Sequence, residues 1–361
     1  MNERSFIVKC VVDSASSRSL PPFSAPIGWK PIPRLLLTSA LPKCLLIPVN
    51  DKRIEQVLHG FSSSGRYLVG VSAGRDSVAL LHSLLARGYR RLIVCHFDHQ
   101  LRGRSSAADA RFVARLAEQN GLTFETAAAD VRGRAAAEKL SIETAARAAR
   151  YEFFAAVARR RRCRTIFLGH HADDLVETFL INLFRGAGLR GQRSMQAVST
   201  RRVGNVNLTI VRPLLSVWRA EIDVDIEQHR LRYRDDATNA RLESLRNRVR
   251  HHVIPLIEKE FGRDIRKALR RAATIAADED ALLDAMLPEI SDRLSVSEVR
   301  GLPVALQRRT LVHWLRAHNV SDAGFEMIEA VRALLGSGGP AKVNLTGGRH
   351  ARRRAGKLFI E

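Results

Sequence analysis

The chain contains few acidic side chains, few aromatic side chains, only four cysteines and no long apolar run. Its 361 residues include 37 Asp and Glu against 59 Lys and Arg, for a formal charge of +22 at pH 7. This imbalance favours a polyanionic partner, with nucleic acid as the first candidate, although a basic surface that only confers solubility is an alternative. Because aromatic residues make up only 6% of the chain, we do not expect extensive stacking of bases on aromatic rings.

The four cysteines exclude a disulfide scaffold, because Cys10, Cys44, Cys95 and Cys163 are scattered and form neither a CxxC pair nor a zinc spacing. This usage is typical of a reducing compartment, and we expect a cytoplasmic protein. No stretch approaches the roughly 18 uninterrupted apolar residues of a membrane helix, so we expect no membrane association. With 45% apolar residues the chain is too hydrophobic to be disordered and long enough for two or three domains.

The first 50 residues differ from the rest in composition. They hold seven of the twelve prolines and six Lys or Arg but only two acids. No helical or strand period runs through them. We expect a flexible Pro-rich extension over residues 1–50, and an organelle transit peptide of similar composition is the alternative.

From about Ile54 the chain alternates between strand-like and helix-like segments. The expected strands are 67–71, 92–97, 122–128, 165–168 and 208–211, and the expected helices are 78–85, 107–120, 141–160 and 173–184. Strands separated by helices predict an α/β domain with a doubly wound parallel sheet over residues 51–215.

After Pro213 the pattern becomes mainly helical. Helical spacing covers residues 218–229, 247–259 and 264–287, three short helices are expected within 295–335, and residues 341–361 read as a basic hairpin. This pattern predicts a helical linker domain over residues 216–290 and a small basic α+β domain over residues 291–361.

A loop of small and polar residues joins the first strand to the first helix of the α/β domain. Its residues are Ser72, Ala73, Gly74, Arg75, Asp76 and Ser77. A strand, a tight loop and a helix N-terminus together form an anion site, because free backbone N–H groups and the helix dipole favour negative charge. A carboxylate in such a loop indicates a bridging Mg²⁺, with Asp76 as its ligand. An ordinary strand–helix turn is the alternative.

Charged side chains also follow the expected strand 165–168. His170, Asp174 and Glu177 lie at i, i+4 and i+7, so they are expected to share one face of an exposed first helical turn. Ligands of open α/β sheets bind at the carboxyl ends of the strands. Two carboxylates there can hold a cation, either a metal or an ammonium group, and a solvated acidic first turn is the alternative.

Arginines recur in three further places. Arg147 and Arg150 share a helix face with Glu143, which indicates either a surface ion-pair ladder or groups that stabilise charge on a phosphate. Arg246 and Arg250 lie in a basic helical run, and the cluster of Arg352, Arg353 and Arg354 lies in the terminal hairpin. We expect these two basic segments to bind RNA, with a solvated basic surface as the alternative.

Residues 72–77 resemble the SGGxDS loop of the PP-loop ATP pyrophosphatases, with Ala73 where a glycine is usual. The methyl group of Ala73 would crowd a phosphate or resist a positive φ. Other stretches resemble motifs of the tRNA(Ile)-lysidine synthetases. They are HFDHQLRG at 96–103, IETAARAARY at 142–151, GHHADDLVET at 169–178 with RGAG at 185–188, RPLL at 212–215, DDATN at 235–239 and RNRVR at 246–250.

The resemblance implies a Rossmann-like PP-loop domain and a ligase that forms a C–N bond. ATP, with Mg²⁺, would adenylate the wobble cytidine of the CAU-anticodon tRNA(Ile), and free L-lysine would then replace AMP to give lysidine. Asp174 and Glu177 would recognise lysine, His170 would act near the reacting phosphate, and Arg147 and Arg150 would stabilise its charge. A PP-loop tRNA 2-thiolation enzyme and a catalytically silent RNA-binding paralogue are the alternatives. The sequence leaves the oligomeric state open, with a homodimer among the choices.

Overall fold

The structure, a computed structural model, describes residues 52–101, 104–234, 244–320 and 323–361. The predicted extension of residues 1–50 and the motif at 235–239 lie outside the described residues. Within these described ranges, no helix is both long enough and apolar enough to cross a membrane.

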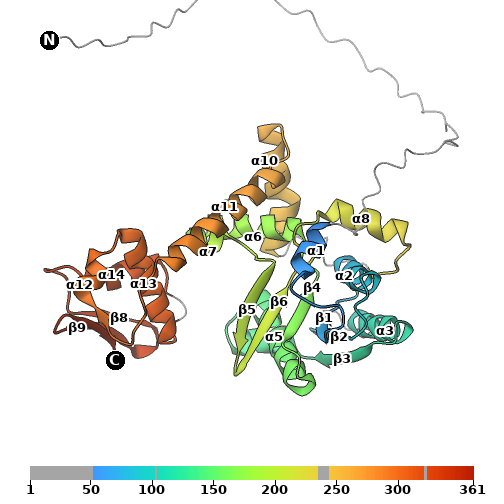
Figure 1. The fold of residues 1–361 in the computed structure, drawn as a ribbon, viewed down its shortest axis with the longest axis horizontal. Coiled ribbons are helices and arrows are strands. Elements are labelled where there is room, and N and C mark those ends of the chain that lie inside the picture. Colours follow the sequence, from blue (N-terminus) through green and yellow to red (C-terminus); the bar gives the residue numbers. More distant parts are fainter. Residues whose placement is uncertain (1–51, 102–103, 235–243, 321–322) are drawn as a thin grey trace, which may run out of the picture. The chain divides into compact units, whose positions relative to one another are not determined.

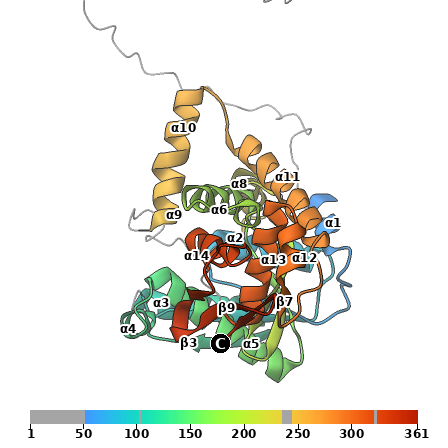
Figure 2. The same ribbon diagram turned by 90° about the vertical axis from the view of Figure 1, so that its left-hand side faces the viewer.

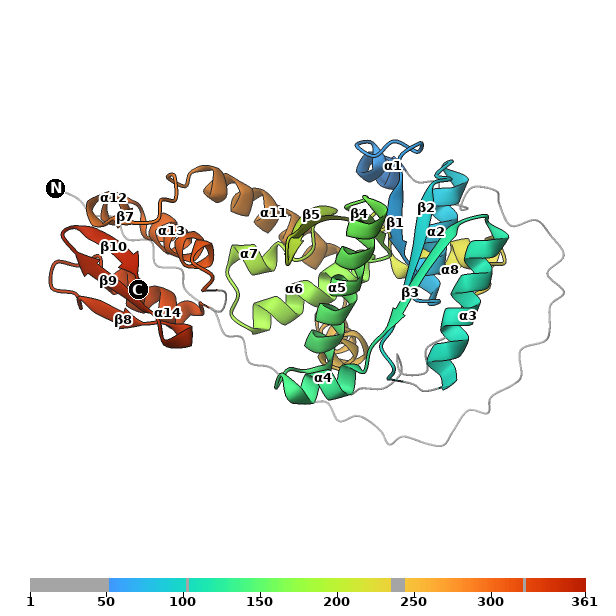
Figure 3. The same cartoon turned by 90° about the horizontal axis from the view of Figure 1, so that it is seen from below.

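A six-stranded sheet forms the centre of the α/β part. Its strands are β1 (Tyr67–Gly70), β2 (Leu92–Asp98), β3 (Thr123–Ala128), β4 (Thr165–Leu168), β5 (Val198–Val203) and β6 (Val206–Val211). The order is β3-β2-β1-β4-β6-β5, with β3 and β5 at the two ends. Figure 3 shows β5, β4, β1 and β2 following one another from left to right. All neighbours pair in parallel except β5, which is antiparallel to β6. The predicted parallel sheet is confirmed, whereas strand β5 was not predicted, because it is a polar edge strand without an apolar run.

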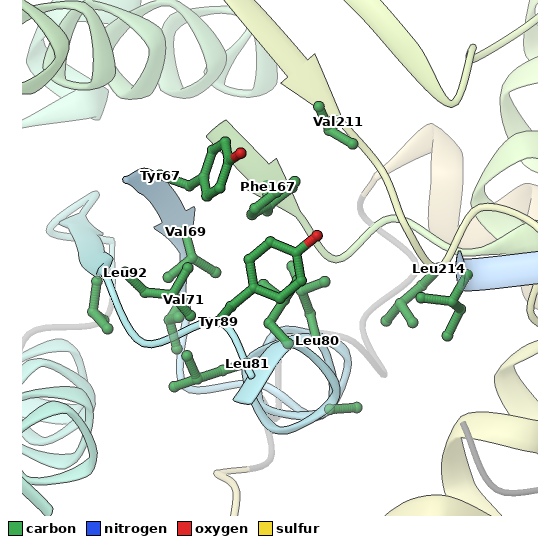
Figure 4. Close-up of a cluster of buried hydrophobic side chains, with 14 of the residues drawn as sticks. Tyr67, Val69, Val71, Leu80, Leu81, Tyr89, Leu92, Phe167, Val211 and Leu214 are labelled. Carbon is green, nitrogen blue, oxygen red and sulfur yellow. The ribbon is translucent and has the colours of Figure 1, made fainter. Parts of the chain in front are cut away.

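Helices cover both faces of this sheet (Figure 1). They are α1 (Lys52–Leu58), α2 (Arg75–Ala86), α3 (Arg104–Gln119) and α8 (Arg219–Gln228) on one face and α5 (Ile142–Arg161), with α4 (Val131–Ala137) beside it, on the other. Successive residues of a strand point to opposite faces, so Val69 packs against α2 while Leu68 packs against α5. Figure 4 shows the first of these cores, in which Tyr67 and Tyr89 lie around Phe167. Burial on both faces explains why the strands read as continuous apolar runs.

The strand order places a crevice between two adjacent strands. From β1 the chain proceeds to β2 on one side, whereas from β4 it proceeds to β5 and β6 on the other. The loops that leave the carboxyl ends of β1 and β4 therefore diverge, which is where ligands bind in sheets of this type.

A second group of helices packs beyond β4. It comprises α6 (Ala172–Phe184), α7 (Leu189–Gln192), α9 (Leu245–Arg248), a π-helical turn (Val249–Val253), α10 (Ile254–Phe261) and α11 (Arg266–Ala285). The apolar side of α6 packs against Val249, Ile254 and α11. The continuous helix predicted over 247–259 is interrupted by the π-helical turn, a feature common near functional sites.

The C-terminal residues have a core of their own, and the ribbon in Figure 2 draws their helices and strands in orange and red. Helices α12 (Val296–Gly301), α13 (Val304–Ala317) and α14 (Phe325–Ala333) pack on a four-stranded antiparallel sheet of order β7-β10-β9-β8. Its strands are β7 (Leu294–Ser295), β8 (Lys342–Asn344), β9 (His350–Arg354) and β10 (Lys357–Ile360), and a 3₁₀ turn covers Thr346–Gly348. The three helices were predicted, and the predicted hairpin is the β9–β10 part of this sheet.

Candidate active site

The loop between β1 and α2 has the geometry of an anion site. Gly74 is the N-cap of α2 and has no side chain to cap the first turn, so the N–H groups there remain available to a ligand. Ser77 closes the loop from within: its Oγ accepts from the backbone N–H of Ser72 at 3.1 Å and donates to the carbonyl oxygen of Gly74 at 2.8 Å. The loop is thus held in shape before any ligand binds.

Ala73 adopts the left-handed conformation, with φ of 71°. Its carbonyl oxygen accepts from the backbone N–H of Arg234 at 3.0 Å. Its methyl group is 1% exposed and belongs to the apolar core under the loop. Ala73 thus adopts the positive φ that its methyl group was expected to resist. The burial of Ala73 in the core under the loop argues against contact of its methyl group with a phosphate.

The stability of Ala73 variants follows from these two facts. Glycine would relieve about 1–2 kcal/mol of left-handed strain. It would lose about 0.8 kcal/mol of methyl burial and about 0.5–1 kcal/mol to chain entropy. We therefore expect Ala73→Gly to change the free energy of unfolding in urea by less than about 1 kcal/mol, and Ala73→Val, which is β-branched, to lower it by about 2 kcal/mol or more. An unchanged unfolding midpoint for the valine variant would contradict this backbone conformation.

The loop after β4 lies directly against the first turn of α2. A Cβ atom on Gly169 would lie 2.8 Å from the carbonyl oxygen of Asp76, so only glycine fits without separating the two segments. Asp76 faces an imidazole and a guanidinium group, with its Oδ2 3.8 Å from His171 Nε2 and 3.5 Å from an Arg219 guanidinium nitrogen. Its other oxygen, Oδ1, is buried without a hydrogen-bond partner. A carboxylate oxygen left over in this way fits the predicted Mg²⁺ ligand.

Asp174 and Glu177 are 9% and 1% exposed, so the expectation of an exposed first turn is wrong. The segment that carries Arg246 and Arg250 covers them. Arg250 Nε donates to Glu177 Oε1 at 2.6 Å, and a terminal nitrogen lies 3.1 Å from Glu177 Oε2 and 3.4 Å from Asp174 Oδ1. Arg246 lies 3.4 Å from Glu177 and donates to Thr178 Oγ1 at 2.7 Å. Both arginines were predicted to bind RNA, yet here they hold the two carboxylates, and their RNA contact stays a prediction.

Two histidines precede helix α6, and their pKa values are shifted in opposite directions. His170 lies outside the helix, so it does not share a helical face with Asp174 as predicted. Burial, assisted by Arg212 and Arg150, lowers the pKa of His170 to about 3 despite Asp174, which leaves a neutral imidazole at pH 7. For His171, burial favours the neutral form, but Asp173, Asp174 and Asp76 outweigh it and raise the pKa.

His171 was not singled out from the sequence. Its ring nitrogens lie 3.5 Å from Asp173 and from Asp174, and its backbone N–H donates to Asp174 Oδ2 at 3.1 Å. The sequence signal for His171 was the HHxDD pattern. In this pattern a helix N-cap residue is followed at the N3 position by a carboxylate that can accept from the N-cap backbone N–H.

The two buried carboxylates respond to their surroundings in opposite directions. Burial opposes ionisation of Asp174, but His171 and Arg246 together hold its pKa below the ordinary value. Burial raises the pKa of Glu177 even though Arg250 lies against it. Two carboxyl groups whose pKa values are shifted in opposite directions can take different roles. One stays negatively charged, and the other serves as a proton acceptor.

Replacing Arg250 should therefore produce a pH-dependent loss of stability. Without the guanidinium the pKa of Glu177 rises further, so the folded state binds a proton more readily than the unfolded state, and stability falls as pH rises above about 4.5. We expect Arg250→Met to lower the free energy of unfolding by about 3–5 kcal/mol at pH 8 and by less at pH 5. The exposed neighbour Arg248→Met is the control and should stay within about 0.5 kcal/mol at both values. Equal losses at both pH values would show that Glu177 is not the affected group.

Arg147 and Arg150 converge on one aromatic ring. Their guanidinium carbons lie 5.6 Å and 5.8 Å from the ring centre of Tyr151, which is itself buried. Arg147 is exposed and Arg150 is half-buried, with its Nε lacking a hydrogen-bond partner. Both extend from the first half of α5.

Comparison with known families agrees with this geometry. The model of the PP-loop domain matches residues 48–257, and the model of the TilS substrate binding domain matches residues 294–359. The loop, the sheet order and the match together define a PP-loop ATP-binding protein.

Proteins of similar sequence identify the family within this PP-loop class. The tRNA(Ile)-lysidine synthase of Chlorobaculum tepidum is 34% identical over 74% of this chain and 82% of its own length, and that of Thermosynechococcus vestitus is 33% identical over 80% and 83%. That of Geobacter sulfurreducens is 36% identical over 78% of this chain but only 62% of its own length. The chain belongs to the tRNA(Ile)-lysidine synthase family, as the sequence motifs predicted.

A solved structure of a U34-tRNA thiolase from Methanococcus maripaludis is also similar. The identity is 16%, the TM-score is 0.47, and the match covers 62% of this chain and 76% of that one. Similarity at this level carries no functional argument.

Proposed function

We propose that this chain ligates lysine to C2 of the wobble cytidine in CAU-anticodon tRNA(Ile), with ATP as the activating substrate. One observation carries the proposal: the carboxylates of Asp174 and Glu177, held by arginines, lie beside the PP-loop at the point where the sheet changes direction. An anion site next to a cation site is what a reaction between ATP and an amino group requires.

The chemistry proceeds in two displacements. The C2 oxygen of cytosine attacks the α-phosphorus of ATP, a P–O bond forms, and pyrophosphate leaves. The ε-amine of lysine then attacks C2, AMP leaves with the former C2 oxygen, and the amine loses a proton. The products are lysidine, AMP and pyrophosphate.

Each side chain of the site has a separate role in this reaction. Asp174, with its lowered pKa, stays ionised and orients the lysine ammonium, while Glu177, with its raised pKa, is the better proton acceptor. Neutral His170 lies near the reacting phosphate, and Arg147 and Arg150 stabilise its charge. Asp76 would hold Mg²⁺, which when bound neutralises charge on the phosphates.

The remaining parts of the chain would contact the RNA. We assign tRNA contact to the linker residues 216–290 and to residues 291–361, next to a catalytic domain of residues 51–215. The reaction needs tRNA and free lysine, which fits the cytoplasmic location predicted from the sequence.

Sulfur insertion is a weaker alternative. Of the described cysteines, Cys95 and Cys163 are both buried, and burial raises the pKa of each thiol. Neither thiol is therefore disposed to act as a nucleophile. Incorporation of labelled lysine that depends on both ATP and tRNA tests the proposal, and incorporation of sulfur instead of lysine would replace it.

The carboxylates provide a direct prediction. We expect Asp174→Asn and Glu177→Gln each to lower kcat/KM for lysine by about 10²-fold, since a charged hydrogen bond is worth roughly 3 kcal/mol. Exposed Asp278→Asn on α11 is the matched control and should leave the rate unchanged. Thermal unfolding of each variant separates lost recognition from lost folding. Wild-type lysine kinetics in either folded variant would remove that carboxylate from the site.

The terminal sheet provides another prediction. On β9, Arg352 pairs with Glu361 at 2.5 Å and Arg353 donates to the carbonyl oxygen of Gly336, whereas Arg354 and nearby Lys357 are exposed. Changing Arg354 and Lys357 to Ala should weaken tRNA binding and reduce the slope of log K against log[salt] by up to about 2. ATP affinity should not change. An unaltered salt slope would identify this surface as solvated and not RNA-bound.

A further inference from the structure

A cluster of arginines surrounds Tyr151 outside the PP-loop. Besides Arg147 and Arg150 of α5, the guanidinium carbon of Arg201 on β5 lies 4.3 Å from the ring centre. Arg212, at the end of β6, is 5% exposed and donates to the carbonyl oxygen of Gln196 at 2.7 Å and to Ser199 Oγ at 2.9 Å. Burial lowers the pKa of Arg212, and the nearby Tyr151 partly opposes this effect. Three separate elements therefore contribute to one positively charged site.

This cluster lacks internal counter-charge. Among the described residues, no carboxylate forms an ion pair with Arg147, Arg150, Arg201 or Arg212, which are named together here as the Tyr151 cluster. Burial, and then the charge of neighbouring arginines, lowers the pKa of three of them, Arg150, Arg201 and Arg212. The buried Nε atoms of Arg150 and Arg212 also lack hydrogen-bond partners. Like charges brought together out of water are unfavourable unless an anion joins them.

We infer that Arg201 on β5 and Arg212 at the end of β6, on one side of the Tyr151 cluster, form a second phosphate site, which binds a phosphodiester of the substrate RNA, while Arg147 and Arg150 on α5 stay assigned to the reacting phosphate. The inference rests on the proposed function for the identity of the RNA. Guanidinium groups suit this role, because each can donate two parallel hydrogen bonds to a phosphate.

The sheet order favours RNA over ATP as the source of the phosphate. The PP-loop follows β1, the carboxylates of α6 follow β4, and the cluster uses β6 and β5. Since neighbouring strands lie about 4.8 Å apart, the backbone of β5 is roughly 14 Å from that of β1, so Arg201 extends from the part of the sheet that is remote from the PP-loop. The cation site for lysine lies between them. The remaining polyanionic substrate is the tRNA.

Strand β5 also supplies a matched control. Arg202 follows Arg201 directly, so its side chain lies on the opposite face of the strand. It is exposed, and its Nε donates to the carbonyl oxygen of Gly204 at 3.2 Å. Removal of either residue takes one positive charge from the same strand, but only Arg201 belongs to the Tyr151 cluster.

The test measures binding of unmodified tRNA(Ile) to the full chain across a salt series, without turnover. We expect Arg201→Ala to weaken tRNA binding about tenfold and to reduce the slope of log K against log[salt] by about 1, with ATP affinity unchanged. Arg202→Ala should stay within about twofold of wild type. Arg201→Lys keeps the charge without the paired donors and should give an intermediate affinity.

The alternative outcomes are distinct. Equal effects of Arg201→Ala and Arg202→Ala on tRNA affinity would overturn the site. Lost ATP binding with intact tRNA binding would also overturn it, because the phosphate would then be that of the nucleotide. The wild-type chain could fail to incorporate lysine while Arg201→Ala still lost tRNA affinity. That result would contradict the proposed reaction but support the phosphate site. Removal of one of four like charges should not lower the unfolding temperature, so a folded variant is expected.

Discussion

The close approach of two loops at Gly169 fixes the geometry of the whole site. The position of a Cβ atom there would meet backbone atoms of Asp76 and Ser77, which cannot move without unwinding the first turn of α2. The absence of that one carbon lets the loop after β4 lie on the loop after β1. His171, Asp174 and Asp76 then meet across the crevice, and the phosphate site and the carboxylates become neighbours.

Charge in this site is balanced by groups that are far apart in the sequence. Glu177 on α6 is covered by Arg250, and Asp173 accepts from the Arg219 backbone at 2.9 Å and from Arg266 at 2.8 Å. These pairs tie α6 to the start of α8, to the π-helical turn and to α11. A buried carboxylate that lost its partner would be strongly unfavourable, so the helices beyond the sheet have to pack where they do. The same ion pairs therefore determine both the charge of the site and the packing of these helices.

The sequence predicted those features whose signal is local. The parallel strands read as apolar runs because both faces are buried, and the loop at 72–77 was recognisable because its strand, small residues and helix adjoin. Burial of Asp174 and Glu177 could not be predicted, because Arg246 and Arg250 lie some 70 residues further on. Strand β5 was missed because it is an edge strand of mostly polar residues and carries no apolar pattern. The direction of the Ala73 methyl group depends on the core beneath it, which no single segment reveals.

The fold also shows which of the described arginines in this positively charged chain have carboxylate partners and which do not. Net charge indicates a class of partner, but it does not distinguish an arginine that holds the protein together from one that is left for a ligand. Arg250, Arg266 and Arg219 all have carboxylate partners around the crevice. Arg201 and Arg212 lie at the neighbouring strands and have none among the described residues. Positive charge that lacks a carboxylate partner in the described part of the chain therefore lies beside the crevice, where a bound anion would lower the energy of the folded protein.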